Sequence, residues 1–391
     1  MGIFIAGSLI QTIILINDED YAFPAYQGAL LAIAVVVVCY VVNAYASKAL
    51  PYWQNAFFLL HVLAYFAYIV PIWVNAPTAT HSQVWGEFQN DGGWPSMSLA
   101  VLVGQVTGIS EQVGIDTVSL AARIYQHILT KTRQIAHMAE EVQNASRVLP
   151  RAMISVYILN FALLFPAILT VCYHMPDLQA GLDDSTTYPA IYVMRQAMST
   201  RWISVLLAVI AVIAFVSAIN YFAAVTRDLF AFARDHGMPF SEWLGTIDSR
   251  KNLPIHAGQL STVIAALLSL IYIGSPVAFY AITSLCTVSL VGCYTMSISS
   301  VLWRRIYLPH TLPPSQFSLG RWGVACNLCA VIFGTWSFFW SFWPQTSAVT
   351  ASSLNWASPI FCSVLVFSVC HYYWKARHVY LGPVRKVEGR T

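Results

Sequence analysis

The sequence has very few charged residues for its length. Only 9% of its 391 residues are Asp, Glu, Lys or Arg, whereas 58% are hydrophobic. Soluble domains carry about 25% charged residues and about 45–50% apolar ones, and a single water-soluble core cannot hide such an apolar excess. The apolar runs are continuous and do not alternate with polar residues, which disfavours a strand-built barrel and indicates helices that span a membrane.

The sequence also lacks the motifs of several functional classes. It has no paired histidines at helical spacing, no nucleophile elbow and no phosphate-binding loop, so a membrane-embedded enzyme is disfavoured. The net charge of +3 is too small to indicate nucleic-acid binding. The eight cysteines lie in or beside apolar runs, and Cys326 and Cys329 form a CxxC pair without a second pair of ligands. We therefore expect no metal, no cofactor and no nucleic-acid partner.

Nine stretches of the chain are long and apolar enough to cross a membrane, since a spanning helix needs about 20 residues. They lie at 28–46, 52–74, 95–117, 150–174, 202–226, 255–273, 277–301, 323–343 and 355–374. A shorter run at 3–16 covers only about 21 Å as a helix, and the chain has no Lys or Arg before Lys48, so a signal peptide is disfavoured. We interpret this run as the end of a helix whose beginning is absent.

Basic residues lie on alternate connections between these stretches. Of the 20 Lys and Arg residues, only Arg195 and Arg201 lie in odd-numbered connections, such as 75–94. The even-numbered connections and the C-terminal tail hold all the others. Because Lys and Arg accumulate on the cytoplasmic side of a membrane, the even connections and the tail, 376–391, are predicted to be cytoplasmic.

The stretch 95–117 differs from the others in its glycines and polar side chains. Charged groups within a membrane are costly, and they are candidates for function. Glycines make a helix easy to interrupt, and an interrupted helix exposes backbone dipoles that can hold a charged substrate or ion. The alternative is a small-residue packing face at Gly104 and Gly108, but packing does not explain the two carboxylates. The predicted substrate-binding residues are Gly104, Gln105, Thr107, Gly108, Ser110, Glu111, Gly114 and Asp116.

Two further groups of polar residues are weaker candidates. Ser217, Asn220 and Tyr221 lie along 202–226, where they either line a cavity or bond to neighbouring helices. The segments AHMAEEVQNASRVLPRA and TRDLFAFARDHGMPFSEW mix acidic and basic residues, and Pro150 in the first of them suits the first turn of the next helix. These charges are either solvated helix ends or ion pairs of a cytoplasmic gate. The candidate gate residues are Glu140, Glu141, Arg147, Arg227, Arg234 and Asp235.

These two segments carry a family resemblance, together with LPIHAG, IYIGSPVAF and FSLGRWGVACN further along the chain. The chain resembles fungal permeases of the amino acid–polyamine–organocation superfamily, in the branch of γ-aminobutyrate, choline and amino acid permeases. The matching pieces run from about residue 9 to 384, in the family's order. The resemblance implies one permease domain over residues 1–391, with an all-α, multi-pass fold and a five-plus-five inverted repeat.

In such folds the first and sixth helices are unwound at the midplane and hold the substrate, and 95–117 corresponds to the sixth. The resemblance further implies a proton-coupled symporter of a small amine or amino acid in the plasma membrane. The family's first two helices and the start of the third are missing here, so half of the expected site is missing and we expect the chain as written not to transport. A non-transporting receptor or scaffold and an inactive fragment are the alternatives. Glu111 stands where the family has an apolar or small residue.

The chain departs from the family between Asp116 and the AHMAEE motif, which are nearly adjacent in the family. Removing residues 118–134 gives GIDTIAHMAEEV and restores that spacing. Val118–Ser119 can be encoded as a splice donor and Gln134 as an acceptor, so we interpret 118–134 as a retained intron. The alternative is a genuine amphipathic insertion that lies on the inner membrane surface.

Overall fold

The computed structural model describes residues 2–18, 20–46, 50–110, 145–184, 188–248, 253–312, 316–350, 354–380 and 382. Within these ranges the regular structure is helical, apart from an isolated bridge between Asp248 and Leu253. Among these described residues, eight helices are long and apolar enough to cross a membrane. Many large apolar side chains on them are exposed, such as Val74 at 74% and Met296 at 70%, as expected where lipid is the solvent. The prediction of a multi-pass, all-helical protein is confirmed.

The eight spans coincide with eight of the nine predicted stretches. They are Ala25–Tyr45, Ala56–Asn75, Arg147–Tyr173, Thr200–Arg234, Ile255–Gly274, Leu285–Tyr307, Gly320–Trp340 and Ala357–Val379. Of the ninth stretch, 95–117, the structure describes the helix α5, Met97–Ser110, and the remainder lies outside the described residues. The short run at 3–16 forms the helix α1, Gly2–Asn17.

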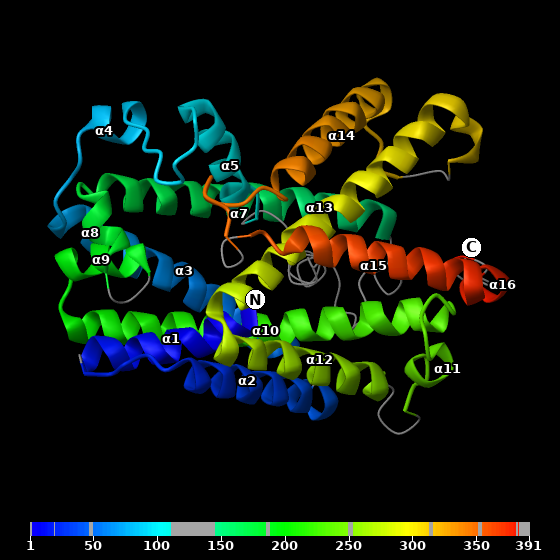
Figure 1. The fold of residues 1–391 in the computed structure, drawn as a ribbon, viewed down its shortest axis with the longest axis horizontal. Helices are drawn as coiled ribbons and strands as arrows, with labels where there is room; N and C mark the ends of the chain where they lie inside the picture. The colour runs from blue at the N-terminus through cyan, green and yellow to red at the C-terminus, as the bar shows by residue number, and fades with distance from the viewer. Residues whose placement is uncertain are drawn as a thin grey trace. The chain divides into compact units, whose positions relative to one another are not determined.

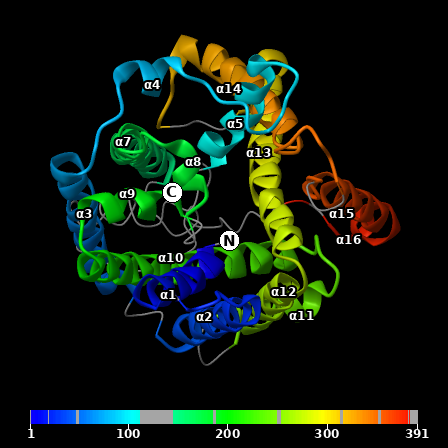
Figure 2. The same ribbon diagram turned by 60° about the vertical axis from the view of Figure 1, so that its left-hand side comes forward.

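The helices divide into two compact units, which we describe separately. The first unit contains residues 1–64, 204–276 and 362–391. In both ribbon views α1, α2, α10 and α12 run side by side within it (Figures 1 and 2). The described helices of this unit are α1, α2 (Ala25–Tyr45), part of α3 (Leu50–Asn75), most of α10 (Thr200–Arg234), α11 (Ser241–Leu244), α12 (Ile255–Gly274), most of α15 (Ala357–His371) and α16 (Arg377–Val379).

The core of the first unit is apolar and closely packed. Its buried residues come from α1, α2 and α10, and Ala265 of α12 packs against them. Gly28 lets α2 approach α1, because a Cβ there would lie 2.6 Å from the Oε1 atom of Gln11. Close approach through small residues is the usual way in which membrane helices pack. The buried core residues are Ala6, Val35, Val36, Cys39, Ala218, Ile219 and Phe222.

The second unit contains residues 65–203 and 277–361. Within it α7 contacts α4 and α9, and α5 contacts α14. The backbone N–H of Ala79, in the connection before α4, donates to the carbonyl of Tyr173 at the end of α7 (2.6 Å). Besides parts of α3, α10 and α15, its helices are α4 (His81–Gly86), α5, α7 (Ala145–Tyr173), α8 (Leu178–Leu182), α9 (Pro189–Ala197), α13 (Pro276–Tyr307) and α14 (Gly323–Trp340).

Two helix boundaries differ from the sequence-based expectation. The apolar stretch 202–226 ends at residue 226, but α10 continues to Arg234 because hydropathy marks the apolar length of a helix and not its last hydrogen bond. Pro150 was expected in the first turn of its helix, but α7 is already helical at Ala145. Pro150 therefore lies in the helix interior, where it has no N–H to donate to the carbonyl four residues earlier.

The motif after α10 ends the helix with a specific turn. The N–H of Gly237 donates to the carbonyl of Phe232 (3.0 Å), and the N–H of His236 donates to that of Ala233 (2.9 Å). This is the Schellman pattern, and it places His236 in the left-handed region with φ 61°. His236 and Gly237 of the segment DHGMPF thus form the turn that ends α10.

Replacing Gly237 with valine is expected to lower the thermal stability of the purified protein. A Cβ at this position would overlap the ring of Phe232, so the ring or the turn must shift. Overpacking of this kind costs about 1–3 kcal/mol, which a thermal unfolding scan in detergent would detect. Gly274→Val is the matched control, because no atom of the described residues lies within 4 Å of a Cβ there. An equal unfolding temperature for both variants would contradict the assignment.

Candidate functional site

The described part of the predicted substrate-binding stretch is the helix α5, which includes Gly104, Gln105, Thr107, Gly108 and Ser110. A Cβ at Gly104 or Gly108 would meet no atom of the described residues within 4 Å. By contrast, a Cβ at Gly292 of α13 would lie 2.9 Å from the ring of Phe338 on α14. The two α5 glycines therefore make no close contact with the described elements. Glu111, Gly114 and Asp116 lie outside the described residues.

Gly108 borders a cavity of ≈ 490 Å³ within the second unit. This volume lies in the range of small-molecule sites, about 300–1,000 Å³. The walls come from α5, α7, α13 and α14 and are mostly apolar. The described lining residues are Gly108, Ile109, Tyr157, Phe161, Leu164, Phe165, Ile168, Val291, Tyr294, Thr295, Ile298, Ala330, Phe333, Gly334 and Ser337.

The hydroxyl groups of Thr295 and Ser337 in this wall are already engaged within their own helices. Thr295 Oγ1 donates to the carbonyl of Val291 (2.7 Å), and Ser337 Oγ donates to that of Phe333 (2.8 Å). These groups can still accept hydrogen bonds but have no proton left to donate. The wall of the cavity is thus mostly apolar, and these two hydroxyl groups can only accept hydrogen bonds from a solute.

The segment before α5 is anchored to the segment after α14. The side chain of Asn90 forms two hydrogen bonds with the backbone of Trp94. Its amide nitrogen donates to the Trp94 carbonyl (2.6 Å), and its Oδ1 accepts from the Trp94 N–H (2.9 Å). The Trp94 ring packs on Trp343, with ring centroids 5.7 Å apart. Ser347 donates to the carbonyls of Gly92 (2.8 Å) and Gly93 (2.6 Å). These contacts hold the start of α5 beside α14, and so position Gly108 at the cavity.

The three polar residues predicted on α10 share one face of the helix. Ser217, Asn220 and Tyr221 are spaced three and four residues apart, and side chains at this spacing are neighbours. Ser217 and Asn220 are half-buried and Tyr221 is 50% exposed, whereas the adjacent Ile219 is buried in the core of the first unit. The polar face therefore points out of that core. It belongs to the first unit, whereas α5 belongs to the second.

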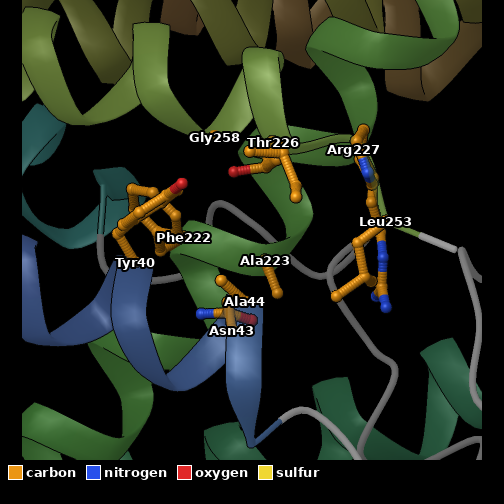
Figure 3. A pocket seen from close by; sticks show the side chains of 11 residues that line it. Tyr40, Asn43, Ala44, Phe222, Ala223, Thr226, Arg227, Leu253 and Gly258 are labelled. Atoms are coloured by element: carbon orange, nitrogen blue, oxygen red, sulfur yellow. The ribbon is translucent and has the colours of Figure 1, made fainter. Parts of the chain in front are cut away.

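The structure describes four of the six candidate gate residues. Arg234 Nε lies 3.4 Å from Oδ1 of its neighbour Asp235, an ion pair at the end of α10. Arg227 lines a small pocket at the same end of the first unit (Figure 3). Arg147 is exposed at the start of α7 in the second unit. Glu140 and Glu141 lie outside the described residues.

Several residues that border these spaces were not predicted from the sequence. Tyr157, Tyr294, Thr295 and Ser337 line the larger cavity, and Thr226 lines the small pocket. Each is a single polar residue in an apolar helix. The sequence shows that such a residue is present, but it does not show whether the residue faces a cavity, a neighbouring helix or lipid.

The eight apolar spans found among the described residues define a multi-pass helical membrane protein. Residues 1–367 match the amino acid permease family. The chain belongs to this family, whose members are transporters and not enzymes. It is therefore a multi-pass membrane protein of the amino acid permease class.

Several characterised and uncharacterised permeases are similar to the chain. The amino-acid permease BAT1 of Arabidopsis thaliana is 26% identical over 399 residues, which cover 98% of the chain and 73% of that protein. The choline transporter of Saccharomyces cerevisiae is 22% identical, with 84% of the chain and 55% of that protein covered. Amino-acid permease 2 of Neurospora crassa is 27% identical, with 76% and 51% covered. The chain thus spans between about half and three quarters of these relatives' length.

Proposed function

We propose that the full-length protein takes up a small amine or amino acid across the plasma membrane by symport with protons. The observation that carries this proposal is the cavity of ≈ 490 Å³ beside Gly108, at a helix whose glycines have no packing role among the described residues. A backbone that is free of close neighbours can unwind and present its dipoles to a charged substrate. The cavity walls then hold the apolar part of that substrate.

The substrate is proposed to be an amino acid, γ-aminobutyrate or choline. Similar proteins include amino-acid permeases and a choline transporter. The mostly apolar wall suits the carbon skeleton or the methyl groups of such a solute. Its charged groups would be held by α5 and by the carboxylates of Glu111 and Asp116, with Ser217, Asn220 and Tyr221 of α10 as further contacts. Glu140, Glu141, Arg147, Arg227, Arg234 and Asp235 are proposed to act at the inner gate.

Uptake measurements test this function. The gene that encodes the chain is expressed in cells that lack their own amine permeases, and radiolabelled amino acids, γ-aminobutyrate and choline are offered one at a time. Saturable uptake that rises with an inward proton gradient supports symport. Saturable uptake that a protonophore does not reduce would contradict proton coupling and would indicate a carrier that is not driven by protons. Binding without accumulation would favour a receptor.

The orientation of the chain is also proposed. The distribution of basic residues predicts that 75–94 faces outward and that the segment after α10 faces the cytoplasm. In a variant whose eight native cysteines are replaced, Ser82→Cys is expected to react with a membrane-impermeant maleimide in intact cells. Glu242→Cys is the matched position, since both side chains are exposed, and is expected to react only after permeabilisation. The reverse pattern would overturn the orientation.

A further inference from the structure

A small pocket with a few polar groups in a mostly apolar wall lies in the first unit, between the end of α2, the last turns of α10 and the start of α12 (Figure 3). Tyr40 and Asn43 belong to the last turns of α2, and Ile255 and Gly258 to the first turn of α12. Because α2 and α12 are each about as long as the membrane is thick, the pocket lies near the level of the lipid headgroups. Its volume is only ≈ 40 Å³, within ≈ 410 Å³ of empty space that includes its open side. It is too small for the transported solute.

Thr226 presents an unused hydroxyl group to this pocket. The residue is 9% exposed, and its Oγ1 atom is buried without a hydrogen-bond partner among the described residues. Threonines in helices commonly donate to the carbonyl four residues earlier, as Thr12 does to Ser8 (2.9 Å) and Thr262 does to Gly258 (2.8 Å). Since a buried hydroxyl without a partner is unfavourable, an absent group is expected to bind Thr226.

The other groups around the pocket favour a negative charge. Arg227 follows Thr226 on α10, and its long side chain extends along the pocket past Leu253 (Figure 3). The hydroxyl of Tyr40 is directed from α2 toward the Thr226 side of the pocket (Figure 3). The N-terminal end of α12 adds a partial positive charge, and its N-cap, Pro254, supplies no side-chain cap.

Asn43 has a structural role and does not offer a hydrogen-bond donor to an anion. Its side-chain amide donates to the carbonyls of Cys39 (2.8 Å) and Ile219 (3.0 Å), which ties α2 to α10 beside the pocket. Among the described residues that line the pocket, Arg227 carries a charge and the other side chains are neutral.

We propose that this pocket binds the phosphate group of an anionic phospholipid. A phosphate oxygen can accept from the Thr226 hydroxyl and from the guanidinium of Arg227, while its charge meets the N-terminal end of α12. The position at the headgroup level favours a phosphate carried by a lipid over one free in solution. Basic pockets between membrane helices are a recognised kind of lipid site. A bound lipid would hold the ends of α2, α10 and α12 together.

The proposal is tested on the purified protein by native mass spectrometry and thermal unfolding, with phosphatidylserine, phosphatidylcholine and inorganic phosphate as separate probes. We expect phosphatidylserine to be retained and to raise the unfolding temperature more than phosphatidylcholine does. Arg227→Gln removes a charge-assisted hydrogen bond and is expected to weaken phosphatidylserine binding about tenfold or more. Thr226→Val keeps the side-chain shape, and it is expected to weaken binding by a smaller factor while leaving the protein folded.

Arg234→Gln is the matched control, because it removes the same charge from the same helix outside the pocket. Retained phosphatidylserine binding in this control, with loss in both pocket variants, supports the site. Equal binding in the wild type and both pocket variants would overturn it, since the hydroxyl would then be satisfied by water. Stabilisation by inorganic phosphate that equals that of the lipid would also overturn the lipid assignment. None of these measurements depends on uptake, so the proposed transport function can fail independently.

Discussion

Replacing Gly108 with leucine in the full-length protein is expected to reduce uptake to background while the protein still reaches the membrane. The added side chain would project from α5 where no described atom lies within 4 Å, so folding should tolerate it. It would, however, fill part of the cavity of ≈ 490 Å³ and favour an unbroken helix at the proposed site. Uptake of the labelled substrate and surface biotinylation, measured on the same cells, separate these two effects.

Gly274→Leu provides the control for this experiment. It makes the same substitution at a helix glycine whose Cβ would also meet no described atom, but in the first unit and not among the residues that line the cavity. This control should transport normally. Asp116→Asn tests the carboxylate predicted from the sequence, and it is expected to abolish uptake as well. If Gly108→Leu and Asp116→Asn both transport like the wild type, the site assignment is wrong.

The dominant messenger RNA is expected to lack the stretch that encodes residues 118–134, which we propose to be a retained intron. These residues lie outside the described part of the chain. The segment has 17 residues (134 − 117), hence 51 nucleotides, so its removal keeps the reading frame. It also places Arg123, Lys131 and Arg133 between a membrane-spanning stretch and its cytoplasmic motif, where they have no evident role.

Amplification across this region from messenger RNA and from genomic DNA decides the question. The genomic product should be longer than the RNA product by 51 nucleotides, and sequencing should show Thr117 joined to Ile135. The genomic reaction is the internal control for length. A dominant transcript that retains the 51 nucleotides would identify the segment as a genuine insertion, which would then be examined as an amphipathic helix at the membrane surface.

Some limits of sequence reasoning are visible at particular residues. Pro150 suits a first helical turn by its missing N–H, yet α7 is helical five residues earlier, because local preference is a weak constraint once a helix packs. Trp340 illustrates the same point: it is 8% exposed and packs against Trp343 with ring centroids 4.9 Å apart. Its place in the apolar stretch 323–343 does not reveal that burial.

The sequence by itself determined the class of protein, eight of its spans and the candidate stretch 95–117. These follow from the free energy of moving each residue from water to lipid, which is a local property and can be read along the chain. Only the tertiary structure decided that Gly108 borders a cavity, that Ser217 and Tyr221 face away from the core of the first unit, and that the Thr226 hydroxyl enters a pocket. Those facts depend on which helices lie beside one another, and the side of a helix that a neighbour covers is set by packing between segments far apart in the chain.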